Sequence, residues 1–106
     1  MAQFDVHRNP GRTRDSIPFV VVLQSAIFDG YQRRVVIPLV RKSHFGTIHH
    51  AGFNPSFTIK GTQVVLHPLE IASIPASALG DPVASLSAHG DKIIAAMDEL
   101  TTQAYG

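Results

Sequence analysis

The sequence predicts an α+β fold that is mainly β, in which a small antiparallel barrel or sheet is closed by one C-terminal helix. β-Branched runs separated by turn residues fill the first two-thirds of the chain, and helical periodicity replaces them near residue 87. The 106 residues, 44% hydrophobic and 16% charged, suit one core of ordinary size. We therefore expect a single domain over residues 1–106.

The first half of the chain predicts three strands. Residues 3–7 alternate apolar and polar side chains, and residues 17–25 contain a continuous apolar run that favours burial on both faces. Residues 33–40 form the next strand, and the turn signal Asp29-Gly30-Tyr31 predicts that it pairs with the second strand as a hairpin. Because Pro38 has no N–H to donate, we expect it at a sheet edge or a bulge.

The second half predicts a loop, further strands and the helix. Residues 41–55 are irregular, and residues 57–60 and 63–67 flank a second hairpin turn at Gly61-Thr62. Residues 69–74 read as a last strand that ends at Pro75. From Ser87, the expected helix cap, apolar residues recur at helical spacing: Ile93, Ala96, Met97, Leu100 and Ala104.

Composition narrows the function. The chain has no cysteine, which excludes disulfides and thiolate metal sites, and its net charge of +1 lacks the basic excess typical of nucleic-acid binders. Local arginine clusters, at residues 8–14 and 33–34, read as solvated loops and strand starts. No signal peptide opens the chain, and no apolar run approaches the roughly 20 residues that span a bilayer. We expect a cytoplasmic protein without a membrane partner.

No catalytic or metal-ligating motif stands out. The only histidine cluster, His44, His49 and His50, lies in the expected loop without the spacing of a zinc motif. No serine lies in a nucleophile motif, and no glycine-rich phosphate loop is present. The sequence therefore favours a binding protein over an enzyme, with no cofactor, no metal and no catalytic residue.

Five short segments together resemble one known family. Residues 3–6 resemble a Gln-Phe-x-Val opening, and residues 19–29 resemble a Phe-Val-Asp-Val-Gln-Ser-Asp-Ile-Ile-Asp stretch with one extra residue. Residues 34–39, 71–75 and 82–87 resemble Arg-x-Val-Ile-Pro-Leu, Met-Ala-Ser-Val-Pro and Glu-Val-Ala-Asp-Leu-Ser. These segments occur in the order found in the CcdB toxins. Only residues 41–60 lack a clear match.

This resemblance implies an SH3-like barrel with a small additional sheet and a long C-terminal helix, assembled as a homodimer. The implied activity is that of a toxin in a toxin–antitoxin system. The toxin binds the cleavage-and-religation subunit of DNA gyrase and traps the enzyme on cleaved DNA. A cognate antitoxin would neutralise it, and the toxin–antitoxin complex, not the toxin alone, would bind operator DNA and repress the operon.

The resemblance also implies site residues. The turn after the long strand and the end of the helix would contact gyrase, through Gln24, Ser25, Ile27, Phe28, Asp98, Tyr105 and Gly106. Apolar side chains from the same two regions would form the dimer interface: Ile27, Phe28, Met97 and Leu100.

The chain departs from the family at its end, and two alternatives to gyrase poisoning remain open. The best-known member ends in Trp-Gly-Ile, whereas this sequence ends in Tyr105-Gly106. One alternative is a degenerate member that binds an antitoxin but poisons nothing. The other is an endoribonuclease toxin of the MazF and Kid type, which would need an acid–base pair beside a basic groove. Its candidates would be Arg12, Arg14, Asp15 and the histidines.

Overall fold

A computed structural model describes residues 2–102 of the chain. Seven strands, two α-helices and four 3₁₀ turns follow one another in these residues. The strands are β1 (Asp5–Arg8), β2 (Phe19–Val22), β3 (Arg33–Arg41), β4 (Ser56–Ile59), β5 (Thr62–Leu66), β6 (Ala72–Pro75) and β7 (Ala84–Ser85). The helices are α1 (Lys42–Phe45) and α2 (Gly90–Thr102), and the 3₁₀ turns are η1 (Ala26–Phe28), η2 (Pro68–Glu70), η3 (Ala76–Ala78) and η4 (Ser87–His89).

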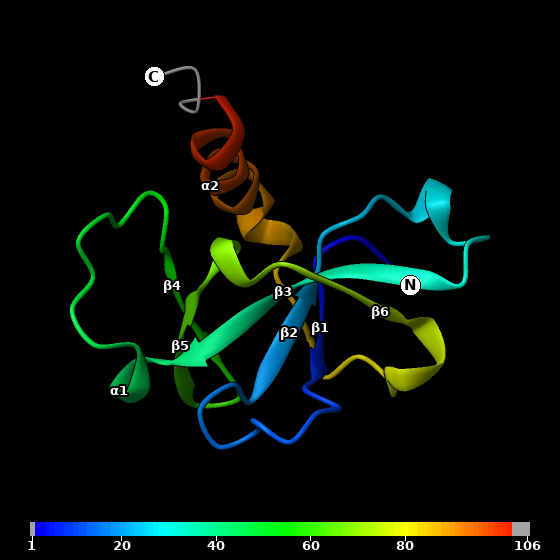
Figure 1. Cartoon of the computed structure of the whole chain (residues 1–106), viewed down its shortest axis with the longest axis horizontal. Helices are drawn as coiled ribbons and strands as arrows, with labels where there is room; N and C mark the ends of the chain where they lie inside the picture. Colours follow the sequence, from blue (N-terminus) through cyan, green and yellow to red (C-terminus); the bar gives the residue numbers. More distant parts are fainter. Residues whose placement is uncertain (1, 103–106) are drawn as a thin grey trace.

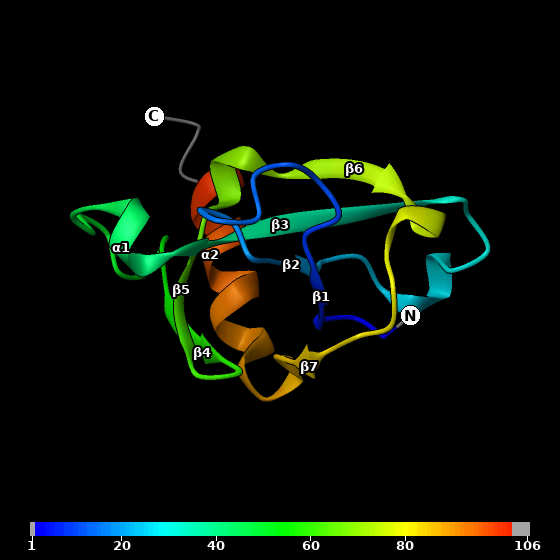
Figure 2. The same ribbon diagram turned by 90° about the horizontal axis from the view of Figure 1, so that it is seen from below.

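The strands form one antiparallel, barrel-like sheet in the order β4-β5-β3-β2-β1-β7. The long strand β3 pairs with β2 along one side, and β5 and β6 share its other side. The first half of β3 pairs with β6 and its last residues pair with β5 (Figures 1 and 2). The strand β6 lies off the main strand order and belongs to the same sheet through its pairing with β3. The fold is α+β and mainly β, as the sequence predicts.

Both faces of the central strands are buried, as the continuous apolar run predicts. Phe19 and Val21 point into the main core, whereas Val20 and Val22 join a second cluster on the opposite face. Leu79 and Ile74, from the segment around β6 and η3, cover this second face. The alternation follows from the two-residue period of a strand. The β2–β3 ladder is therefore fixed from both sides.

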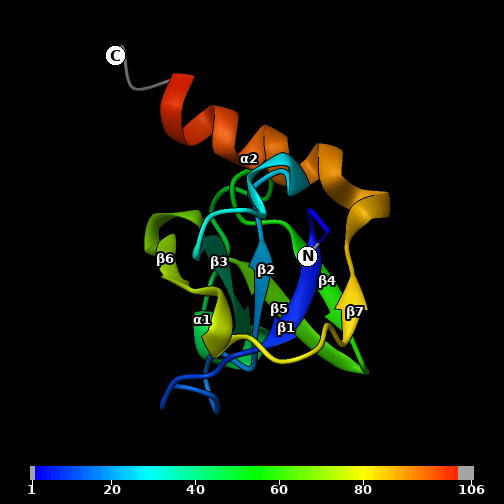
Figure 3. The same ribbon diagram turned by 90° about the vertical axis from the view of Figure 1, so that its right-hand side faces the viewer.

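Helix α2 closes the main core. Ile93 and Ala96 are fully buried against it, and Met97 packs at its margin. Figure 3 shows the helix lying across one end of the strands. The expected cap at Ser87 is wrong, because Ser87 lies inside η4 and its hydroxyl accepts a hydrogen bond from Ser85 Oγ at 3.1 Å. The helix begins at Gly90, later than the cap position predicts.

The position of Pro38 differs from the prediction. It lies inside the central strand β3, opposite Val20, and not at an edge or a bulge. Its carbonyl accepts the N–H of His67 at 3.0 Å, so its ring nitrogen faces the side that β5 and β6 share. The ladders there cover residues 33–36 and 39–41, which leaves Pro38 in the gap between them. The missing donor therefore costs no ladder bond.

The other boundaries shift by a few residues. The strand expected over residues 17–25 is shorter in the structure, where β2 covers only Phe19–Val22. The expected last strand begins at Ala72, because Pro68–Glu70 form η2. The irregular segment contains α1, and the β4–β5 turn lies at Lys60 and Gly61, both with positive φ. Within the described residues, the helices lack the length and continuous apolar character needed to span a bilayer.

Candidate functional site

The most exposed apolar surface lies on the turn between β2 and β3. Ile27 exposes 81% of its surface, Tyr31 70% and Phe28 47%. The rings of Phe28 and Tyr31 stand 6.2 Å apart between centroids, in a tilted arrangement. We call these three residues the apolar turn. Figures 1 and 2 both show it at the end of the molecule away from α1.

Two polar residues before the turn set its shape. Ser25 caps η1, because its hydroxyl accepts the backbone N–H of Ile27 at 3.3 Å. Gln24 continues the β2–β3 pairing with its side chain. Its Oε1 accepts the N–H of Val35 at 2.8 Å, and its Nε2 donates to the carbonyl of Arg33 at 3.3 Å. Both side chains therefore fix where η1 leaves the sheet.

The buried side chain of Arg34 holds the turn from beneath. Only 6% of Arg34 is exposed. Its Nη1 donates to the carbonyl of Tyr31 at 2.6 Å, and its Nη2 donates to the carbonyl of Asp29 at 3.0 Å. Its Nε lies 3.7 Å from a carboxylate oxygen of Asp29, close enough for an ion pair but too long for a hydrogen bond. One guanidinium thus pairs with the carboxylate of Asp29 and also holds two backbone carbonyls of the turn.

The second part of the expected site lies on α2. Asp98 is exposed, and Ile94, one turn earlier on the same face, exposes 43% of its surface. Met97 and Leu100 are half-buried, so each retains apolar surface after the chain has folded. Tyr105 and Gly106 lie outside the described residues. Asp98 and the half-buried pair are thus available to a partner.

Comparison with protein families identifies the relationship. The model of the family described as CcdB protein matches residues 3–103, which is nearly the whole chain. The chain belongs to the CcdB family. Members of this family are toxins of toxin–antitoxin systems, and the matched region contains the apolar turn and the described part of α2. Among curated proteins, no sequence matches this chain.

The geometry groups the expected CcdB-type residues into two regions. Gln24, Ser25, Ile27 and Phe28 form one continuous unit at η1. Asp98 belongs to the separate surface of α2, and no hydrogen bond or ion pair in residues 2–102 joins that helix to Ala26–Phe28. In a single copy of this CcdB-family chain, the residues expected at the gyrase contact therefore lie in two separate regions.

Two exposed residues beside these regions do not emerge from the sequence patterns. Tyr31 belongs to a turn signal in the sequence, and the structure shows that it carries a large exposed ring. Ile94 lies next to the buried Ile93, and adjacent residues on a helix point in different directions. Ile94 could have been found as an apolar residue that lies outside the apolar face of the predicted helix.

Of the residues considered for ribonuclease chemistry, the three histidines share one cavity in this CcdB-family structure, and Arg12, Arg14 and Asp15 are not among the residues that line it. His44, His49 and His50 line a cavity of about 610 Å³ beside α1. Arg14 donates to the carbonyl of Gly11 at 3.1 Å, and the carbonyl of Asp15 accepts from Arg41 at 2.9 Å. Among residues 2–102, no three His, Asp or Glu side chains are grouped so as to hold a metal ion.

Proposed function

We propose that this protein is a toxin that binds the cleavage-and-religation subunit of DNA gyrase and traps the enzyme on cleaved DNA, without catalysing a reaction itself. The observation that carries the proposal is the apolar turn, in which Ile27 is 81% exposed on a backbone fixed by hydrogen bonds from the buried Arg34. Family membership supports the choice of target, because it places the chain among the CcdB toxins.

The turn has the properties of a binding hot spot. A few side chains, often aromatic, supply most of the binding free energy of a protein interface when a partner buries them in a well-packed pocket. Ordering a loop on binding costs free energy, and a turn already held by Arg34 and Gln24 avoids much of that cost. Ile27, Phe28 and Tyr31 therefore suit tight binding to a complementary groove.

We also propose that the active form is a homodimer. Met97 and Leu100 keep apolar surface on α2 that a second copy would cover, together with Ile27 and Phe28 of the turn. A two-fold assembly would repeat both contact regions, so that the gyrase contact would combine Gln24 and Ser25 with Asp98, Tyr105 and Gly106. A cognate antitoxin would compete for the same surfaces. Operator DNA would be bound only by the toxin–antitoxin complex.

The apolar turn can be tested by direct binding to the purified cleavage-and-religation subunit of gyrase, measured by isothermal titration calorimetry. Replacing Ile27 with Ser should weaken binding by at least about 30-fold, the loss expected when a hot-spot side chain is truncated. Because Ile27 is exposed in the single chain, the free energy of unfolding of the monomer should change by less than about 0.5 kcal/mol, apart from any change in dimerisation.

The matched control is Leu69→Ser, which removes an equally large aliphatic side chain that is 67% exposed in η2, away from the apolar turn. This variant should bind the gyrase subunit within about twofold of the original protein. Equal binding by the original protein and Ile27→Ser would exclude the turn as the contact. No binding by any of the three proteins would favour the degenerate family member.

A further inference from the structure

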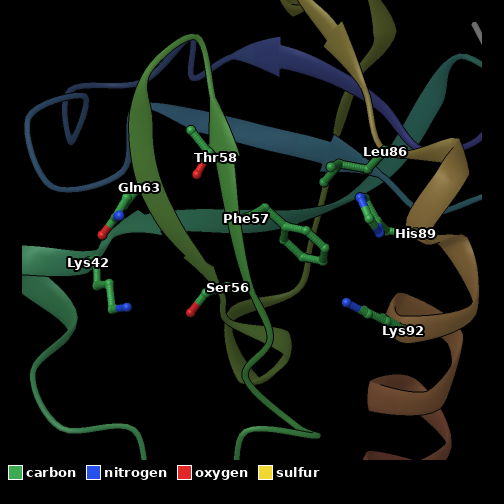
Figure 4. Close-up of a pocket in the computed structure, with 8 residues that line it drawn as sticks. All are labelled: Lys42, Ser56, Phe57, Thr58, Gln63, Leu86, His89 and Lys92. Atoms are coloured by element: carbon green, nitrogen blue, oxygen red, sulfur yellow. The ribbon is translucent and has the colours of Figure 1, made fainter.

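A polar surface that is distinct from the apolar turn lies at the junction of α1, the β4–β5 hairpin and the start of α2. A cavity of about 260 Å³ is lined there by Lys42, Ser56, Phe57, Thr58, Gln63, Leu86, His89 and Lys92. Figure 4 shows the ammonium groups of Lys42 and Lys92 pointing inward from opposite sides, with the Ser56 hydroxyl between them. We call this cavity the lysine pocket.

The polar side chains of the lysine pocket are left unused by the described part of the chain. In residues 2–102, none of the side chains of Lys42, Ser56, Thr58, Gln63 and Lys92 forms a hydrogen bond or an ion pair. By contrast, Arg33 and Arg34 are each held by two or more hydrogen bonds. The donors of the lysine pocket are thus available to whatever occupies it.

The charge in the lysine pocket has one sign. Two ammonium groups line it, together with an imidazole, two hydroxyls and an amide, and no aspartate or glutamate is among the lining residues. The ring of His89 lies 5.7 Å from that of the buried Phe57, which limits the positions that the imidazole can take. Lysine ammonium groups and neutral hydroxyl and amide donors are the groups that bind phosphate oxygens in proteins.

We propose that the lysine pocket binds one phosphate group carried by a small molecule. The cavity exceeds the ~30 Å³ that a water molecule occupies in the liquid by a wide margin, so it has room for a phosphate and part of its substituent. Its donors come from α1, β4, β5, η4 and α2. Segments distant in sequence are thus held in one site by the folded core.

The same features argue against a nucleic-acid backbone as the ligand. A protein that follows a phosphate backbone uses a stripe of basic residues along several phosphates, and this chain has a net charge of only +1. The lysine pocket also lies apart from the apolar turn, and the two surfaces share no residue. Phosphate binding and gyrase binding can therefore be lost separately.

The test is a titration of the full chain with inorganic phosphate, followed by amide chemical shifts in NMR spectra at constant ionic strength. Phosphate should produce saturable shifts at Ser56, Thr58 and Lys92, whereas sodium chloride at the same ionic strength should not. Replacing Lys42 or Lys92 with Gln should weaken phosphate binding by about tenfold each, because each change removes one charged donor.

The control is Lys60→Gln, which removes the remaining lysine of the chain, outside the pocket in the β4–β5 turn. It should leave phosphate binding unchanged. An equal loss in Lys60→Gln, or equal shifts with chloride, would overturn the proposal in favour of general charge attraction. A short DNA duplex that displaces phosphate and binds more tightly, with a steep dependence on salt, would overturn it in favour of a nucleic-acid surface.

Discussion

The guanidinium of Arg34 fixes the backbone of the β2–β3 turn through side-chain hydrogen bonds. It donates to the carbonyls of Asp29 and Tyr31, in two part-buried hydrogen bonds. A buried charge is costly unless it is hydrogen-bonded, and here two carbonyls and the nearby Asp29 carboxylate supply partners. Arginine suits this position better than lysine because its planar donors reach several acceptors at once.

Replacing Arg34 with Ala should lower the free energy of unfolding by about 2–3 kcal/mol, since it removes a buried guanidinium that donates to the carbonyls of Asp29 and Tyr31. Urea denaturation followed by circular dichroism measures this change. The control is Arg12→Ala, which removes an exposed arginine and should change stability by less than about 0.5 kcal/mol. Equal losses in the two variants would show that Arg34 does not support the turn.

At the residue scale, the sequence predicts which residues matter better than it predicts how they act. Gln24 and Ser25 are expected at the gyrase contact, and the structure shows both shaping the turn through Val35, Arg33 and Ile27. The amide of Gln24 reaches β3 just beyond Val22, the last residue of β2. Because the Gln24 side chain bonds to the backbone of β3 at a single position, it produces no periodic pattern, and the sequence does not reveal this role.

At the scale of elements, the start of α2 depends on a close contact between Gly90 and Phe4. A methyl group on Gly90 would lie 2.5 Å from Cε2 of the Phe4 ring. The backbone of Phe4 is fixed, because its N–H donates to the carbonyl of Val22 and its carbonyl accepts the N–H of Leu86, so the ring would have to rotate to relieve the clash. Its φ of 68° further shows a backbone held in a left-handed conformation. The first turn of the helix thus packs directly on the start of β1.

Replacing Gly90 with Ala should lower the free energy of unfolding by about 1–2 kcal/mol, because the clash outweighs the gain of up to ~1 kcal/mol in helix propensity. The measurement is urea denaturation. The control is Gly80→Ala, where an added methyl group meets no atom within 4 Å, and its effect should stay below about 0.5 kcal/mol. A stabilised Gly90→Ala variant would contradict the proposed dependence of the helix start on this contact.

The strands could be predicted because apolar runs and turn residues are local signals. The β2–β3 and β4–β5 hairpins are confirmed, and so is the burial of both faces of β2. Pro38 could not be placed, because its tolerance depends on the gap between β5 and β6, two strands distant from it in sequence. The cap at Ser87 failed for a similar reason, since the hydroxyl bonds to Ser85 instead.

At the scale of the whole molecule, the fold class and the family are confirmed, and the gyrase contact remains a prediction. Sequence patterns predict the barrel and the closing helix because both rest on a core whose residues alternate regularly. The surfaces are harder to predict, because exposure depends on all neighbouring elements. The lysine pocket, built from five separate elements, has no sequence signature for this reason.

The most direct measurement is plasmid cleavage by purified gyrase with ATP and added protein, with linear DNA counted on a gel after detergent and protease treatment. We predict linear DNA that increases with the concentration of this protein. Much less linear DNA is expected from the Ile27→Ser variant and from a chain lacking Tyr105 and Gly106. No linear DNA at high protein concentration, with gyrase from the source organism, would contradict gyrase poisoning and leave only the fold and the family.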